Sequence, residues 1–165
     1  MTLSRAVAFA LATLTLAAPG SRAEQTPDPE RGKVVFRTVG GCVNCHGWAA
    51  DGETGVNLRS PPGSNLRDST LDVQGLIEVI ACGRPGTAMP YHDKSAHRDD
   101  RCYGLVRSDL DPDTAPTRGK SLRGEDIASL ASYLQTRVIG LGAPTFAECA
   151  DFFENPAAQA CVNLK

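Results

Sequence analysis

The stretch Cys42-Val43-Asn44-Cys45-His46 decides how the rest of this chain is interpreted. Its two cysteines are three positions apart, so on one helical turn both thiols point to the same side. The spacing C-x-x-C-H is typical of c-type haem attachment, in which each thiol adds to one haem vinyl group. The next residue, a histidine, then offers an imidazole nitrogen to the iron. We therefore predict one haem, bound covalently through Cys42 and Cys45, with His46 as an axial iron ligand.

Three other sites use similar residues, and each fits this sequence less well. A thioredoxin-like redox pair lies near a βαβ pattern, and alternating strands are not evident here. A zinc site needs a second pair of ligands at metal spacing, whereas the other cysteines are far apart and single. A disulfide within the C-x-x-C would leave His46 without a role. Haem attachment is therefore the interpretation that we adopt.

The second iron ligand is predicted in the turn Gly86-Thr87-Ala88-Met89-Pro90. Met89 is the only methionine after Met1, and a lone methionine is often a core filler. Here it follows an amphipathic helix in a loop rich in glycine and proline, where it could reach the open face of a haem. A thioether opposite histidine raises the reduction potential. His92 and His97 could replace Met89 as the ligand, but their charged surroundings favour exposed loop positions.

The four remaining cysteines are expected to form disulfides, because their number is even and an exported protein is oxidised. Three pairings are possible. We favour Cys82–Cys102 and Cys149–Cys161, since each closes a local loop. On the chain-entropy model each bridge stabilises the fold by about 3 kcal/mol.

Helical patterns dominate the chain and predict an all-α fold. Asp28-Pro29-Glu30 indicates a helix start that runs through Phe36. Apolar residues at positions 73, 76, 77 and 80 predict a second helix, opened by a capping-box-like spacing from Ser69 to Asp72. Further helices are expected over 124–138 and 146–154. The segment 47–68, rich in glycine, proline and small polar residues, is expected to be a loop over one haem face.

The N-terminal residues 1–23 resemble a cleaved secretory signal peptide: Arg5, an apolar run and a small-residue cleavage site. An uncleaved membrane anchor is the alternative, although the run is shorter than the roughly 20 residues that span a bilayer. Cleavage would remove Arg5 and Arg22, so the formal net charge would fall from −2 to −4. Such a chain is not suited to nucleic acid. We expect a periplasmic protein without a membrane span after cleavage.

The expected organisation has three parts. After the signal peptide, residues 24–140 form the haem domain, which contains an inserted loop over 90–120. Residues 141–165 form an extension closed by a disulfide. A connection as long as this loop is uncommon and often functional.

The early C-x-x-C-H, the Met-Pro turn and the final amphipathic helix together resemble class I cytochromes c, over about residues 28–90 and 121–139. The resemblance implies a small all-helical fold around one haem, with His46 and Met89 as axial ligands. It implies that the first and last helices cross, and that a proline carbonyl orients the axial histidine. The residues that it assigns to these roles are Gly32, Phe36 and Tyr133 for the crossing, Pro61 or Pro62 for the carbonyl, and Arg59, Arg67 and Trp48 as candidates near the haem propionates.

The resemblance also implies a function, namely a non-enzymatic electron carrier that passes one electron from a dehydrogenase-type donor to another cytochrome or oxidase. The segment from Cys82 to Pro90, with Arg101-Cys102-Tyr103-Gly104 after it, is similar to cytochromes that serve periplasmic quinoprotein alcohol dehydrogenases. A haem enzyme or gas-binding protein with a displaceable sixth ligand is one alternative. A haem subunit fixed in a larger oxidoreductase complex is another.

Overall fold

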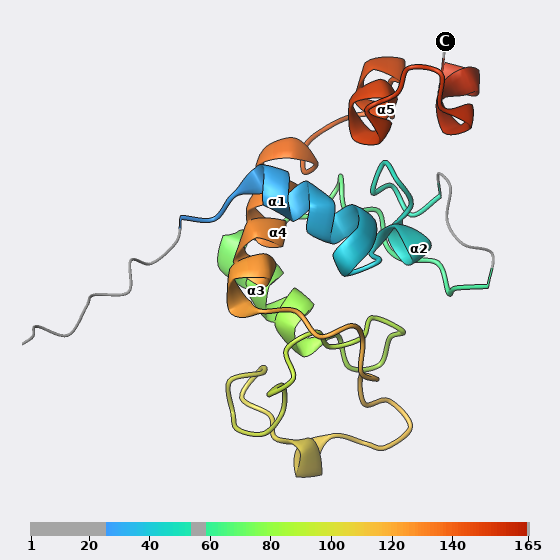
Figure 1. Cartoon of the computed structure of the whole chain (residues 1–165). Helices are drawn as coiled ribbons and strands as arrows, with labels where there is room; N and C mark the ends of the chain where they lie inside the picture. Colours follow the sequence, from blue (N-terminus) through green and yellow to red (C-terminus); the bar gives the residue numbers. More distant parts are fainter. Residues whose placement is uncertain (1–25, 54–58, 165) are drawn as a thin grey trace, which may run out of the picture.

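Helix α1 (Pro29–Val34) begins at the N-cap that the sequence indicates, because the Asp28 carboxylate accepts a hydrogen bond from the Glu30 amide at 2.9 Å. The computed structural model describes residues 26–53 and 59–164 (Figure 1). The predicted signal peptide lies outside these residues. After α1 the backbone continues as a π-helical turn, Val35–Val39, which the sequence pattern did not indicate.

The helical prediction is confirmed at the level of class. The described residues contain helices, short turns and two isolated bridges, but no strand. One predicted boundary is wrong: the cap of the second helix is Asp72, whose carboxylate accepts from the Gly75 amide at 2.8 Å, and not Ser69. The remaining elements are α2 (Val43–His46), α3 (Val73–Cys82), η2 (Arg107–Asp109), α4 (Gly124–Arg137), α5 (Phe146–Phe153) and η3 (Gln159–Leu164).

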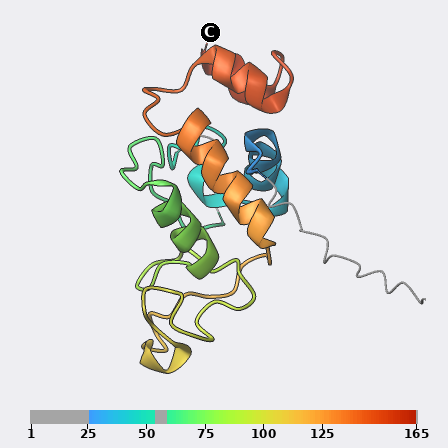
Figure 2. The same cartoon turned by 90° about the vertical axis from the view of Figure 1, so that its left-hand side faces the viewer.

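Helices α1 and α4 cross in close contact, as expected (Figures 1 and 2). Gly32 makes this possible, because a Cβ atom there would lie 2.6 Å from Cβ of Tyr133 and collide with the Ser129 carbonyl. One turn further on, the rings of Phe36 and Tyr133 pack with centroids 5.9 Å apart. Helix α3 packs against α4 from another side, and the apolar residues of α3 and α4 form one buried core with Val35 and Phe36 of the π-helical turn.

The C-terminal extension is closed by a disulfide and packs on the helical core through Phe152. Cys149 of α5 is bonded to Cys161 of η3, the predicted pairing. Phe152 packs on Trp48 and Phe36, with ring centroids 6.0 and 6.4 Å apart. The extension thus contributes to the same core as Phe36 and α4.

The inserted loop lies at the opposite end of the molecule from α5 (Figure 1). Its ends are joined where the Tyr91 amide donates to the Thr117 carbonyl and the Gly119 amide donates to the Tyr91 carbonyl. The predicted Cys82–Cys102 disulfide ties the loop to the end of α3. Apart from the short turn η2, backbone hydrogen bonds of irregular turns hold this segment.

Within the described residues, none of the helices combines the length and the apolar character needed to cross a membrane.

Candidate functional site

The residues of the C-x-x-C-H motif lie on one short helical turn. Cys42 is the N-cap of α2, while Cys45 and His46 belong to the helix itself. Both cysteines are free and partly buried, whereas the other four form the two disulfides. Burial raises the pKa of the Cys42 thiol to about 12. The turn therefore presents two reduced thiols, with the Cys42 thiol held in its protonated form.

His46 is buried, with 8% of its surface exposed, and it is held by one hydrogen bond. Its Nδ1 lies 2.9 Å from the Ser64 carbonyl oxygen. A carbonyl can only accept, so Nδ1 carries the proton and Nε2 keeps its lone pair. Burial lowers the pKa of His46 and outweighs the hydrogen bond to the Ser64 carbonyl, which raises it. The net effect favours the neutral ring. A neutral imidazole with a fixed tautomer is what metal ligation requires.

The carbonyl that orients His46 differs from the one expected. Pro61 and Pro62 both line the neighbouring cavity, but the acceptor is Ser64, two residues beyond Pro62. The reason is the close approach of Gly63, whose amide donates to the Cys45 carbonyl at 2.7 Å. A Cβ atom at Gly63 would lie 2.6 Å from Nδ1 of His46. The backbone therefore passes over the ring at Gly63 and presents its carbonyl one residue later.

A cavity of about 840 Å³ lies between this turn, the loop that follows it and helix α3. This volume is in the range of small-molecule and cofactor pockets. The structure brings all four residues predicted to bind the haem and its iron to its walls: Cys42, Cys45, His46 and Met89. Most of the remaining wall is apolar, with Phe36, Leu76 and Ile80 from the core.

Met89 reaches this cavity from a tight turn after α3. The Arg84 amide donates to the Met89 carbonyl at 3.2 Å, and the Met89 amide donates to the Thr87 hydroxyl at 3.2 Å. These two bonds close the Gly/Pro-rich turn on itself. The backbone of Met89 is thereby held at both its amide and its carbonyl, while the half-buried side chain faces the cavity.

The expectation that His92 and His97 are exposed is wrong. They are 4% and 2% exposed, because the inserted loop folds back on α3 and buries both rings. Nδ1 of His92 lies 2.7 Å from the Lys120 carbonyl, and Nε2 of His97 lies 2.9 Å from the Cys82 carbonyl. His92 lines the cavity with Met89, whereas His97 belongs to a different hollow.

The residues proposed near the haem propionates are not among the described residues that line this cavity. The Arg67 guanidinium is buried in the attachment of the extension, where it donates to the carbonyls of Ala49 and Gly142 and pairs with Glu148 at 2.8 Å. Trp48 packs on Phe152 and Phe153. Arg59 is exposed at the edge of the described loop. Long-range packing thus gives Arg67 and Trp48 a structural role.

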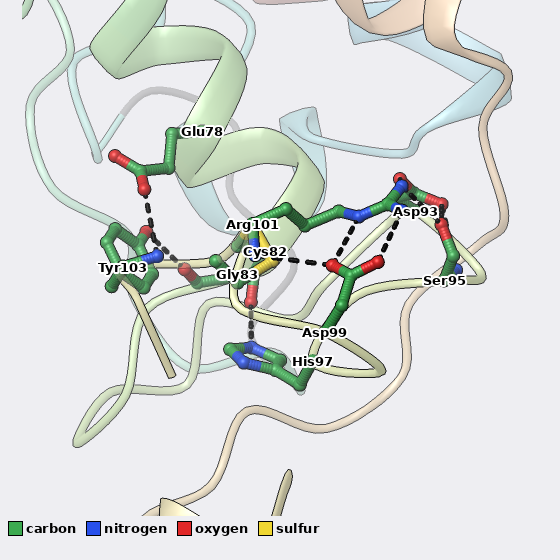
Figure 3. The surroundings of a disulfide bond; sticks show 10 residues. Glu78, Cys82, Gly83, Asp93, Ser95, His97, Asp99, Arg101 and Tyr103 are labelled. Carbon is green, nitrogen blue, oxygen red and sulfur yellow. Dashed lines mark hydrogen bonds and ion pairs between the residues drawn. A yellow bond between two sulfur atoms is a disulfide. The ribbon is translucent and has the colours of Figure 1, made fainter. Parts of the chain in front are cut away.

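Sequence reasoning missed several residues at the cavity. Arg84 lines it from the turn before Met89 and supplies a positive charge. Tyr103 and Leu105 line it from the inserted loop, where the Tyr103 hydroxyl donates to the Gly83 carbonyl at 2.6 Å (Figure 3). The Cys82–Cys102 pairing was the one available signal for these two, because it brings residues just after Cys102 to the end of α3.

Comparison of the chain with models of known families, with curated proteins and with solved structures finds no match. In the part of the chain that the structure describes, no group of three or more histidine, cysteine, aspartate or glutamate residues is arranged to hold a metal ion. The fold and the cavity therefore define a mostly helical protein with two disulfides and one large pocket beside a C-x-x-C-H turn.

Proposed function

We propose that this protein is a single-haem electron carrier of the cytochrome c type, with the haem held in the large cavity. The observation that carries the proposal is the joint position of Cys42, Cys45, His46 and Met89 on the walls of one cavity. The two thiols come from one helical turn, and the thioether comes from a turn 43 residues after His46. The order of these residues in the sequence does not by itself require that their side chains line the same cavity.

The residues present fit a covalently bound haem. Bound haem would supply a centre that accepts and releases one electron. Cys42 and Cys45 are reduced and available for thioether bonds. His46 offers a neutral imidazole whose orientation the Ser64 carbonyl fixes. Met89 would supply a second ligand to the iron and so exclude other ligands, which favours electron transfer over substrate chemistry.

Covalent attachment is tested on the exported protein by mass spectrometry and by its absorption spectrum after denaturation. The mass should increase by one haem, and the haem should stay with the unfolded chain. Replacement of both Cys42 and Cys45 by serine should abolish attachment. A wild-type protein that is exported and folded in a cell able to mature c-type cytochromes, yet carries no haem, would contradict the proposal.

Ligation by Met89 is tested with Met89→Ala, and Leu105→Ala serves as a control that removes apolar wall without removing a ligand. The reduction potential of Met89→Ala should fall, and the far-red methionine–iron charge-transfer band should disappear. Leu105→Ala should keep the band. An unchanged band in Met89→Ala would exclude Met89 as the ligand.

His92 supports a second candidate, a haem enzyme or gas-binding protein with a displaceable ligand. It is buried and lines the same cavity, and its bond to the Lys120 carbonyl leaves Nε2 with a free lone pair. Either His92 would replace Met89 on the iron, or it would serve as a polar group beside an open site. Rapid carbon monoxide binding by the reduced protein would favour this candidate, and slow or absent binding favours the carrier.

We further propose that the carrier works in the periplasm, after removal of residues 1–23, and takes electrons from a dehydrogenase-type donor. The motif supports this, since haem attachment of this kind occurs together with export, and the two disulfides suit an oxidising compartment. A quinoprotein alcohol dehydrogenase is the donor that we would test first, by following reduction of the holoprotein. Co-purification at fixed stoichiometry would instead indicate a subunit of a larger complex.

A further inference from the structure

The inserted loop contains a second hollow, of about 620 Å³, which the proposed electron carrier does not use. Its walls come from separate parts of the loop: Tyr91, Lys94, residues 96–98, residues 106–108 and Arg118. The hollow is separate from the cavity of the C-x-x-C-H motif, because the two have no lining residue in common.

The charge of this hollow is opposite to that of the whole chain. Four cationic side chains line it, Lys94, Arg98, Arg107 and Arg118, and none of its described lining residues is acidic. The formal net charge of the chain is −2. The excess of positive charge is therefore local, and it attracts anions to this face of the loop.

Several acidic residues of the loop are bonded elsewhere. Arg101 takes two of them, pairing with Asp99 at 2.6 Å and with Asp93 at 3.9 Å (Figure 3). The Asp109 carboxylate accepts from the Val106 amide at 3.0 Å. No ion pair within the described residues neutralises Lys94, Arg98 or Arg107, and the Arg118 side chain donates to the uncharged Ser121 hydroxyl.

A buried polar atom in the wall of the hollow also lacks a partner. His97 is 2% exposed, and its Nε2 donates a hydrogen bond to the Cys82 carbonyl (Figure 3). Its Nδ1 is buried and has no hydrogen-bond partner. A buried nitrogen without a partner costs free energy, so such an atom calls for an explanation. Because Nε2 donates to the Cys82 carbonyl, Nδ1 of the neutral ring is an acceptor, and the hydroxyl of a ligand in the hollow could donate to it.

We propose that this hollow binds a small oxyanion with at least two negative charges, of the phosphate or polycarboxylate class. Guanidinium groups bind such anions through paired, charge-assisted hydrogen bonds, and Arg98, Arg107 and Arg118 supply three of them. Lys94 adds a point charge, and Ser108 adds a hydroxyl. A concave site of this volume, with His97 in its wall, suits a small anion better than the flat face of an acidic protein.

The test is an amide NMR titration of the full-length exported holoprotein with inorganic phosphate, and then with citrate, at constant ionic strength. Shifts should saturate and concentrate at residues 94–98, 106–108 and 118. Arg98→Gln combined with Arg107→Gln should weaken binding at least about tenfold, because each substitution removes a charge-assisted contact. The matched control, Arg37→Gln with Arg137→Gln, carries the same charge change on arginines of the helical core and should leave binding within about twofold.

A second variant tests His97 itself. His97→Asn keeps a side chain that tolerates the left-handed backbone at this position, where φ is +58°. It should weaken phosphate binding while the amide spectrum outside the loop is unchanged. Shifts that rise linearly without saturation, or an equal loss in the control pair, would overturn the proposal. So would tighter binding of a hexaglutamate peptide with shifts that spread beyond the hollow, since that result identifies a docking surface for an acidic protein. Haem content enters none of these readouts.

Discussion

The helical core and the inserted loop of this protein are stabilised in different ways. The core is a continuous apolar cluster in which Val35 and Phe36, α3, α4 and the C-terminal extension all take part. The loop has a much smaller buried cluster, centred on Cys82, Ala96 and Cys102. Buried histidines, one disulfide and turn hydrogen bonds replace apolar packing there.

This difference shows how a small domain can carry a long irregular loop. Hydrophobic stabilisation grows with the apolar area that is buried, and a loop rich in charged residues has little to bury. A cross-link limits the unfolded loop instead. The cavity lies at the boundary of the two regions, with its thiols and His46 from the core side and Tyr103 and Leu105 from the loop.

The largest effect is expected from Gly32→Val, which would break the core where its backbones are closest. The new side chain would collide with the Ser129 carbonyl and with Tyr133, and neither helix can retreat without opening the crossing. We expect a loss of about 4 kcal/mol or more in the free energy of unfolding, in the exceptional range for one substitution. Urea unfolding followed by circular dichroism measures it. A loss below 1 kcal/mol would show that the crossing is looser than described.

A loss of about 3 kcal/mol is expected when the loop loses its cross-link through Cys82→Ser with Cys102→Ser. The effect should be local, because the bridge closes a segment with a sequence separation of 20 and the helical core does not depend on it. Limited proteolysis should find new cleavage sites between residues 91 and 120. Cleavage within α1 or α4 at the same protease concentration would indicate that the two regions unfold together.

A smaller effect, of about 2 kcal/mol at pH 7, is expected from Asp126→Asn, which weakens the polar contact between α1 and α4. Asp126 is buried and is bonded to Arg31 at 2.7 Å. Burial by itself raises the pKa of Asp126, but the bonds from Arg31 and Arg123 outweigh it and bring the pKa below the unfolded value of 3.8.

The sign of the pH dependence follows from that direction. A carboxyl group whose pKa is lower in the folded protein contributes fully above its unfolded pKa, and loses the contribution as the pH falls through the folded value. The difference between wild type and Asp126→Asn should therefore shrink below about pH 4. Unfolding free energies measured from pH 7 to pH 2.5 test this, and a difference that grows on acidification would contradict it.

The smallest effect is expected from Lys33→Ala, which removes an ion pair between α1 and the extension. The Asp151 side chain is 82% exposed, so water and salt screen the 3.0 Å pair. We expect less than about 1 kcal/mol, and less still at high salt. Thermal unfolding in low and high salt measures the difference. A larger effect would mean that the extension depends on this surface contact more than on Phe152 and its aromatic neighbours.

The sequence by itself determined the features that depend on residues close together in the chain. The C-x-x-C-H turn, the Asp28 cap, the approximate positions of the helices and the local disulfides are of this kind, since their partners are separated by few residues. The capping box of α5, in which Thr145 and Glu148 bond reciprocally, is a local feature of the same kind. The haem, the carrier function and the export of the chain remain predictions from the motif.

Only the tertiary structure decided what depends on contacts between distant segments. It made the Ser64 carbonyl the acceptor for His46 and paired Arg67 with Glu148, 81 residues away. It also buried His92 and His97 under the loop. It also gathered four cations from separate parts of a chain with net negative charge into one hollow. The physical reason is that a side chain's partner and burial depend on which segments pack around it, and local propensity and spacing carry no information about that packing.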